Sequence, residues 1–329
     1  MLYVAAGGPG DLVVARLLAA TDSSPIFVSF LWQRDARCSG PVALEGAHGL
    51  EIRSEGWIAR PSLRGPEHCI LAECLNGAFY CLDSRDLSSA RETLDALRIL
   101  AGGQVRVIDA GGDILCGPGS PWLRSPLLES ATLRLLEDID ALGGATLSIA
   151  GVGLDNEITV EEAEERLPTT LRSAESIDPV DVRALLRRTA GLTSETSRIW
   201  MHAVLGLAGR VWTDSTGRPV SVTRDSSVIF SASASELPTD LPFRRIRSEP
   251  TTLESVNDDL VSAGFLDELK SGIDRPVTLT ERQRALFAER VLPGDYVSDR
   301  FRLRTRLSER FRLALLARPL ARVLEPRYG

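Results

Sequence analysis

The sequence predicts an α/β fold in which a mostly parallel sheet is flanked by helices. In the first 150 residues, short apolar runs typical of buried strands alternate with segments that have the apolar spacing of helices. Three of the apolar runs lead directly into turns rich in glycine and acidic residues, at 5–11, 109–113 and 150–157. Strands and helices that alternate in this way indicate βαβ units, and such units form parallel sheets.

The expected strands of the first half lie at 2–6, 26–31, 69–72, 78–82, 105–108 and 146–150. The helices expected between them lie at 11–20, 88–100 and 125–142. Ser88 and Ser89 are suited to cap the second of these helices. Pro126 is suited to the first turn of the third, because the N–H that proline lacks has no partner there.

Beyond residue 157 the pattern becomes mainly helical. Helices are expected at 160–166, 180–188, 199–207, 253–269 and 280–291, short strands at 210–212, 220–222 and 228–230, and a linker at 238–250. We therefore expect an α/β core at 1–232, which includes a helical segment at about 159–209. A mainly helical C-terminal extension at 233–329 follows, with an arginine-rich end.

Composition excludes several classes of function. The chain has 329 residues, 43% of them hydrophobic, so it can bury a substantial core. Its net charge of −7 disfavours nonspecific binding to nucleic acid, and we expect no nucleic-acid partner. Lys270 is the only lysine, so no glycine turn carries the lysine of a phosphate-binding P-loop.

The cysteines and the apolar runs favour a cytoplasmic protein. The five cysteines are odd in number and none has CxxC spacing, a pattern typical of reduced thiols. The first apolar run stops at Gly7, and no other run approaches the roughly 18 residues of a membrane span. We therefore expect neither a signal peptide nor a membrane-spanning helix.

The three glycine turns supply five acidic residues, which are Asp11, Asp109, Asp113, Asp155 and Glu157. Turns that follow parallel strands meet at the carboxyl edge of a sheet, where α/β proteins bind ligands. Carboxylate oxygens are the ligands that Mg²⁺ and Ca²⁺ prefer. We expect Asp109, Asp113 and Asp155 to hold such a cation.

Glu157 and Asp113 are the catalytic candidates. Glu157 is suited to act as a general base on a water molecule if burial raises its pKa. Asp155 and Glu157 would point the same way if their segment stayed extended. The alternatives are structural: Glu157 in the first turn of the next helix, Asp113 capping a turn, and Asp109 bonded to backbone amides.

Glycines in the first turn leave room for an anion at a helix N-terminus, although the spacing is not that of the GxGxxG fingerprint. The alternative is a tight turn in which Asp11 caps the helix. Trp32 is suited to stack on a flat ring of the ligand, and Arg34 to bind an anion. The alternative is that Trp32 packs on the edge of the sheet and Arg34 forms a surface ion pair. The ligand-binding candidates are Gly7, Gly8, Gly10, Asp11, Trp32, Arg34, Gly111, Gly112, Asp155 and Asn156.

These motifs, in this order and spacing, resemble the family known as domain of unknown function 1152. The matching segments are 7–11, 32–34, 40–41, 109–115, 125–127 and 151–158, with a weaker match at 194–197, and they cover about residues 1–231. The resemblance implies a Rossmann-like α/β core and no established reaction. Pro9, Ala110 and Asn156 depart from the family's pattern, and Pro9 removes one N–H from the first turn.

We expect a small-molecule enzyme, a hydrolase or group transferase acting on a polar metabolite that carries phosphate, ribose or carboxylate. A noncatalytic protein that senses or binds a nucleotide-like ligand would have the same carboxylates and stays the alternative. Residues 300–329 carry nine arginines among phenylalanines and leucines. We expect this segment to dock on the acidic body or on a second subunit, giving a homo-oligomer through the C-terminal helices, rather than on RNA or a membrane.

Overall fold

The computed structural model describes residues 1–31, 42–43, 50–51, 71–72, 74–84, 86–118, 120, 123, 125–167, 171–173, 177–189, 194–213, 219–271 and 296–297. Trp32, Arg34, the helix expected at 280–291 and the arginine-rich end lie outside these residues. Within the residues described, no helix is long and apolar enough to cross a membrane.

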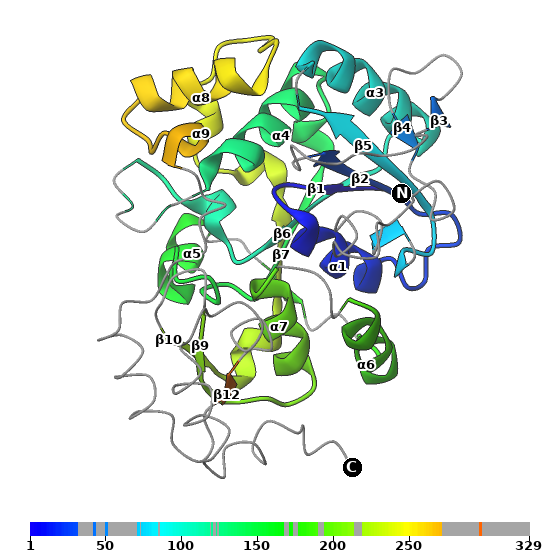
Figure 1. Ribbon diagram of the computed structural model, residues 1–329, viewed down its shortest axis with the longest axis vertical. Coiled ribbons are helices and arrows are strands. Elements are labelled where there is room, and N and C mark those ends of the chain that lie inside the picture. The colour runs from blue at the N-terminus through cyan, green and yellow to red at the C-terminus, as the bar shows by residue number, and fades with distance from the viewer. Residues whose placement is uncertain are drawn as a thin grey trace, which may run out of the picture.

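In the described part of the chain, the main sheet has nine strands in the order β3-β4-β5-β2-β1-β6-β7-β11-β8 (Figure 1). Their bounds are β1 Leu2–Ala5, β2 Ile26–Leu31, β3 Val42–Ala43, β4 Leu50–Glu51, β5 Ala78–Asp83, β6 Val105–Ala110, β7 Thr146–Ala150, β8 Leu171–Ser173 and β11 Ile229–Ser233. The strands from β5 to β7 in this order run parallel, and antiparallel strands extend the sheet at both edges. The predicted α/β class, with a mostly parallel sheet, is therefore confirmed.

Strand β1 lies at the centre and marks the point where the strand order reverses. The chain first builds β2 and β5 on one side of β1, and then β6 and β7 on the other. Ligands of open α/β sheets bind beyond the carboxyl ends of the strands at such a switch point. The turns after β1 and β6 are therefore the first place to look for a site.

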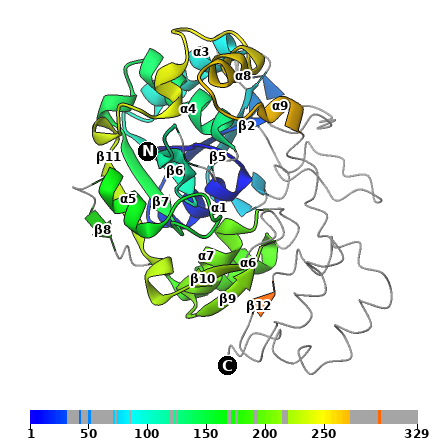
Figure 2. The same cartoon turned by 90° about the vertical axis from the view of Figure 1, so that its left-hand side faces the viewer.

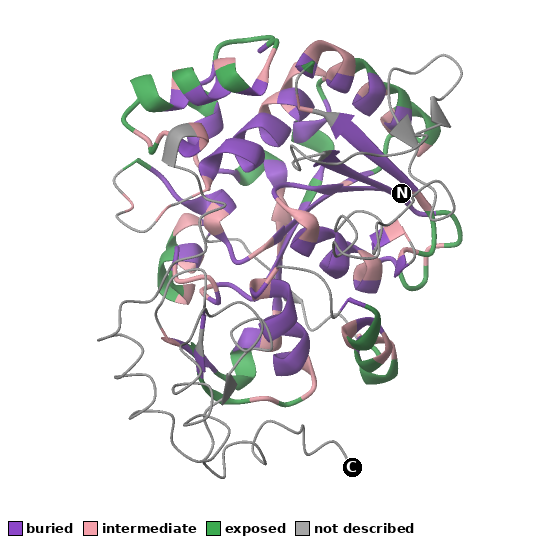
Figure 3. Ribbon diagram, in the orientation of Figure 1, coloured by how far each residue is buried: buried purple, intermediate pink, exposed green. Residues whose placement is uncertain are grey.

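Helices cover both faces of the sheet (Figure 2). The helices are α1 Pro9–Leu18, α3 Leu87–Leu100, α4 Pro126–Asp138, α5 Val160–Arg166, α6 Pro179–Arg188, α7 Thr196–Val204, α8 Leu253–Ser262 and α9 Glu268–Ser271. Because side chains alternate along a strand, Leu2 and Val4 pack into one core with α3, α4 and α8. Tyr3 and Ala5 pack into a second core with α1, α6 and α7. The strands between the two helical layers are accordingly buried (Figure 3).

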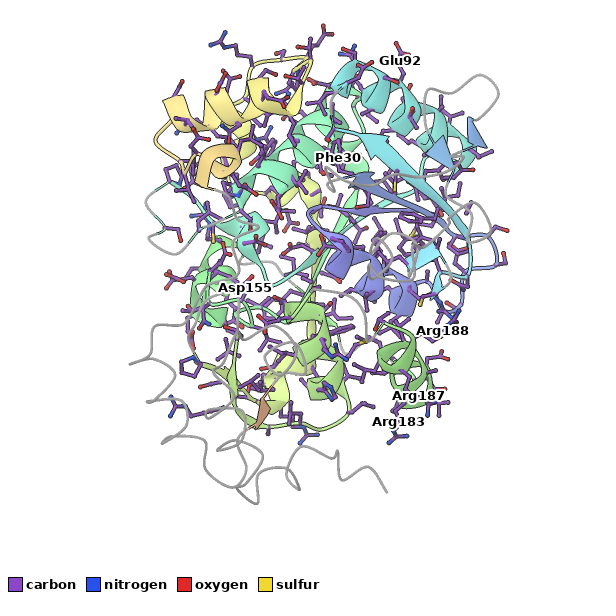
Figure 4. The ribbon with its side chains drawn as sticks, in the orientation of Figure 1. Phe30, Glu92, Asp155, Arg183, Arg187 and Arg188 are labelled. Atoms are coloured by element: carbon purple, nitrogen blue, oxygen red, sulfur yellow. The ribbon has the colours of Figure 1, made fainter. Side chains whose placement is uncertain are left out.

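A smaller sheet has the order β10-β9-β12 in the described residues, with β9 at Gly209–Trp212, β10 at Pro219–Val222 and β12 at Tyr296–Val297. It lies near α7, away from β1 and β2 (Figure 1). Short 3₁₀ turns complete the fold at Asp113–Leu115, Leu142–Gly144, Arg224–Ser227, Ala234–Glu236 and Pro242–Arg245. Helix α6 buries Val182 and directs Arg183, Arg187 and Arg188 outward (Figure 4).

Two expected elements of the first half are wrong in part. Leu71 and Ala72 are helical rather than extended, and the N–H of Leu75 donates to the carbonyl of Leu71 at 2.8 Å, as in a helical turn. The helix expected at 125–142 ends at Asp138, since Asp140 has a φ of 53° and cannot continue it. Helix α3 is confirmed, but Asp86 caps it, accepting from the Ser89 N–H at 3.0 Å.

The segment expected as a linker at 238–250 is packed instead. Leu241, Phe243 and Ile246 are buried in the same core as α3, α4 and α8. The helix expected at 253–269 is divided into α8 and α9, with Gly264 at a φ of 93° between them. The described part of the C-terminal extension thus packs directly on the α/β core.

Candidate functional site

Three turns lie together at the carboxyl edge of β1, β6 and β7. The register pairs Ala5 of β1 with Ile108 of β6, and Ala110 of β6 with Ala150 of β7. Backbone hydrogen bonds join the last two turns: the Gly111 N–H donates to the Ala150 carbonyl at 2.9 Å, and the Gly153 N–H to the Gly111 carbonyl at 2.8 Å. The expectation that these turns share one sheet edge is confirmed.

Asp11 is the third residue of α1 and is only 5% exposed. Its Oδ2 accepts a hydrogen bond from the Gly7 N–H at 2.7 Å and so closes the first turn, but Gly8 is the N-cap of α1 and no described side chain caps this helix. Burial, followed by the charge of Asp109, raises the pKa of Asp11 well above its usual value. Asp11 therefore closes its turn without capping the helix, and it faces the acids of the neighbouring strand.

The side chains of Asp109 and Asp113 are neighbours, and hydrogen bonding from Asp113 lowers the pKa of Asp109 against larger opposing effects. Asp109 lies within β6, and its Oδ2 also accepts from the Gly112 N–H at 2.9 Å. Burial and then the charge of Asp155 raise the pKa of Asp109 to about 7. A pKa of about 7 leaves Asp109 only partly ionised at neutral pH.

Asp113 meets the largest number of like charges. Burial raises the pKa of Asp113 well above its usual value, and the charge of Glu129 adds most among its neighbours. The remaining contributions come from Asp109, Glu157 and Asp155. The Ser125 hydroxyl, at the start of α4, donates to Asp113 Oδ2 at 3.3 Å instead of capping its own helix.

The segment after β7 is a turn, so the extended arrangement considered for Asp155 and Glu157 is wrong. Asn156 has a φ of 65°, a left-handed conformation that asparagine tolerates better than most residues. Asp155 Oδ1 accepts from the Glu157 N–H at 2.9 Å, and burial raises the pKa of Asp155 to about 6. Asp155 lies close to α5 (Figure 4).

Glu157 is 7% exposed and precedes α5, which begins at Val160 after a capping box at Thr159. The alternative that placed Glu157 in the first turn of this helix is therefore wrong. Its charge raises the pKa of Asp113, after burial and the charges of Glu129 and Asp109. Glu157 thus joins the same group of acids. Its charge also affects the buried thiol of Cys116: burial and then the charge of Glu157 raise the pKa of Cys116 to about 12, against one hydrogen bond that lowers it.

Glycines in the turns leave room for side chains from other elements. A Cβ on Gly111 would lie 1.8 Å from Asp155 Oδ2, and the φ of Gly111 is +128°. A Cβ on Gly10 would lie 2.2 Å from the Ser194 hydroxyl, which precedes α7. Gly112 also has a positive φ, of +100°. Gly8 differs from these glycines, because a Cβ there would meet nothing within 4 Å.

Two further acids join the cluster, and sequence reasoning missed both. Glu129 lies in the first turn of α4 and is 9% exposed. Burial and then the charges of Glu268, Asp11 and Asp109 raise the pKa of Glu129 well above its usual value, against one backbone hydrogen bond that lowers it. For Glu129, the feature of the sequence that could have revealed it is a charged residue on an otherwise apolar helical face. For Glu268, no local feature of the sequence indicates a place in the site.

Glu268 comes from α9 and caps α4 from outside. Its Oε2 accepts from the Leu127 N–H at 2.9 Å, and its own N–H donates to Asn257 Oδ1 at 3.1 Å. Burial raises the pKa of Glu268 to about 7. The C-terminal segment therefore reaches the edge of the site.

The cluster gathers acids at high density. The neighbouring charges that raise the pKa values of Asp11, Asp109, Asp113 and Glu129 belong to other carboxyl groups. Within the described ranges, no group of three or more His, Cys, Asp or Glu side chains is placed so that it could hold a metal ion. The described cysteines Cys74, Cys81 and Cys116 are buried.

No curated protein and no solved structure matches the chain. The family described as protein of unknown function (DUF1152) matches residues 2–275. This match extends beyond the 1–231 covered by the sequence motifs, and it includes α8 and α9 with Glu268. The chain therefore belongs to the DUF1152 family of proteins of unknown function.

Proposed function

We propose that this protein is a small-molecule enzyme, a hydrolase or group transferase, whose site is the carboxyl cluster at the ends of β1, β6 and β7. The observation that carries the proposal is the position of the cluster: buried acids with raised pKa values lie at the switch point of a parallel sheet. Perturbed acids in such a place are typical of functional sites.

Charge favours a cation as part of the site. Two unit charges about 4 Å apart repel by about 4 kcal/mol at an effective dielectric constant of about 20. A neutral donor offsets less, since a hydrogen bond to a charged group contributes about 1.5–3 kcal/mol. Acids this dense therefore stay protonated or take up a cation. We propose Mg²⁺ or Ca²⁺, held by Asp109, Asp113 and Asp155.

Binding of the cation requires the cluster to change its protonation. The raised pKa values of Asp109 and Asp113 favour their protonated forms, and a cation would displace these protons. The carboxyl oxygens would have to turn from one another toward the ion, because no group of three or more His, Cys, Asp or Glu side chains among the residues described is placed to hold one. Such an ion polarises the bond to be broken and orients the attacking water.

Two of the side chains have separate roles in the proposed reaction. Glu157 accepts the proton of the attacking water, and Asp113 orients the ion or the leaving group. The substrate enters beside Gly8, where the first turn faces open space at the N-terminus of α1. Phosphate, ribose or carboxylate groups suit this position, because the helix end offers N–H groups and the ion offsets the acids.

A noncatalytic binding protein is the second candidate. Asp11, Asp109 and Asp155 each accept a backbone N–H from their own turn, so part of each carboxyl group already has a structural partner. A rigid cluster of this kind would bind a nucleotide-like ligand without turnover. We further propose a cytoplasmic protein that forms a homo-oligomer through its C-terminal helices, with a small molecule rather than nucleic acid as its ligand.

Turnover assays separate the two candidates. Full-length protein is incubated with a panel of nucleotides, sugar phosphates and carboxylic esters, with Mg²⁺, with Ca²⁺ or with a chelator. An enzyme converts at least one compound in a cation-dependent way, and Glu157→Gln lowers its kcat by about 100-fold or more. Saturable binding of a panel compound without any conversion would instead support the noncatalytic candidate.

A further inference from the structure

Glu129 has an unsatisfied oxygen in an otherwise well-bonded region. Its Oε2 is buried and has no hydrogen-bond partner within the described part of the chain. Most buried polar side-chain atoms do have a partner, so each exception requires an explanation. Neighbouring acids show the contrast, because Asp11 and Asp109 both accept backbone N–H groups.

Geometry places this carboxyl group against the first turn. Glu129 Oε1 and Asp11 Oδ2 both lie within 3.4 Å of the position that a Cβ on Gly7 would take. The charge of Glu129 also raises the pKa of Asp113 more than any other neighbouring charge does. The group thus faces acids from the ends of both β1 and β6.

Helix α4 fixes this position from two directions. The Thr132 hydroxyl, one turn after Glu129, donates to the Ala6 carbonyl at the end of β1 at 2.8 Å. At the other side, the Glu268 carboxylate accepts from the Leu127 N–H. The N-terminus of a helix also favours negative charge, which offsets part of the opposing effect of burial on Glu129. A buried carboxyl oxygen that is held in place and has no hydrogen-bond partner among the residues described is suited to a hard cation.

We propose that Glu129 is a further ligand of the cation at this site, bound together with Asp113, and that Glu268 is a positioning residue that holds the first turn of α4. The inference rests on the proposed function in that it uses the same ion. It differs by adding a ligand from a helix rather than from a strand-end turn. A hydroxyl or ammonium group of a substrate is the competing occupant of Glu129 Oε2.

Titration of the full-length protein with CaCl₂ or MgCl₂ alone, followed by calorimetry, tests the assignment. We expect Glu129→Gln, which keeps the side-chain volume, to weaken cation affinity by about tenfold or more. Glu254→Gln is the matched control, because Glu254 is an exposed acid in the first turn of α8. We expect it to bind as the wild type does. Glu268→Gln retains an oxygen for the Leu127 N–H and should weaken affinity less than Glu129→Gln.

The outcomes distinguish this inference from the proposed function. If the wild type binds either cation, Asp109→Asn weakens binding and Glu129→Gln does not, the ion site stands and the role of Glu129 is overturned. If the wild type binds neither cation at a concentration of roughly 10 mM, far above the dissociation constants of intracellular sites, both ion assignments are overturned. Thermal melts with and without CaCl₂ give a second readout: Glu129→Gln should melt cooperatively but lose the stabilisation by the ion.

Discussion

The carboxyl group of Glu129 fills the space beside Gly7. A Cβ on Gly7 would lie 2.0 Å from Glu129 Oε1, closer than any real contact. The next residue, Gly8, has nothing within 4 Å of the same position. Two adjacent glycines therefore differ: Gly7 makes room for an acid from α4, and Gly8 leaves the turn open.

Alanine at these two positions should have unequal effects. We expect Gly7→Ala to lower the free energy of unfolding by about 1–3 kcal/mol, because the added carbon displaces a buried carboxyl group. Gly8→Ala should change it by no more than about 0.5 kcal/mol and should weaken ligand binding instead. Urea denaturation of both variants measures the difference, and equal losses of stability would show that the close approach of Glu129 is wrong.

Gly111 should be the least tolerant glycine of the site. Its φ of +128° and the Asp155 oxygen, which would lie 1.8 Å from an added Cβ, both exclude a side chain. Gly102 is the matched control, since its φ is also positive, at +68°, but its surroundings are open. We expect Gly111→Ala to lower the melting temperature several degrees more than Gly102→Ala does. Similar shifts would mean that backbone conformation alone matters at Gly111.

Stability without divalent cations should fall as the pH rises from about 4 to about 7. The pKa values of Asp109 and Glu268 are about 7 in the folded protein, and that of Asp155 is about 6. In an unfolded chain these groups titrate near pH 4. The folded state therefore holds more protons in this range, and stability decreases with pH. Urea titrations in the presence of a chelator measure the free energy of unfolding at each pH. We expect Asp109→Asn to make its decrease with pH less steep. A rise in stability over the same pH range would contradict the account.

Asp113→Asn should stabilise the protein while weakening its function. Five acids meet near this position, and asparagine removes one charge yet can still accept from the Ser125 hydroxyl. We expect the free energy of unfolding at pH 7.5 without cations to rise by about 1 kcal/mol or more. Cation affinity should fall in the same variant. A loss of stability with unchanged affinity would assign Asp113 a purely structural role.

Local sequence patterns predicted the strands and turns that carry the site. Apolar runs followed by turns of glycine and acidic residues predicted that Asp11, Asp109 and Asp155 lie at one edge of the sheet. This prediction was possible because the turns after parallel strands all lie at the carboxyl edge. Asn156 illustrates a finer point: this residue departs from the pattern of the family, yet its left-handed φ of 65° is one that asparagine tolerates better than most residues.

Contacts between distant segments were not predictable in the same way. Glu268 reaches α4 only because α8 and α9 fold back onto the core, and Asn257 then holds its backbone. Glu129 looked like an ordinary helical residue, since nothing local shows that its face points at Gly7. The packed segment around Phe243 was missed because its buried residues have neither the spacing of a helix nor that of a strand.

Proton release on cation binding tests the central claim most directly. Calorimetric titration of the full-length protein with CaCl₂ and MgCl₂ at pH 7, in two buffers of different ionisation enthalpy, gives the number of protons displaced. If the buried carboxyl cluster is a cation site, at least one of the two ions binds and releases protons, because the pKa of Asp109 lies near 7 and that of Asp113 is also raised. Binding without proton release, or no binding of either ion, would contradict the account.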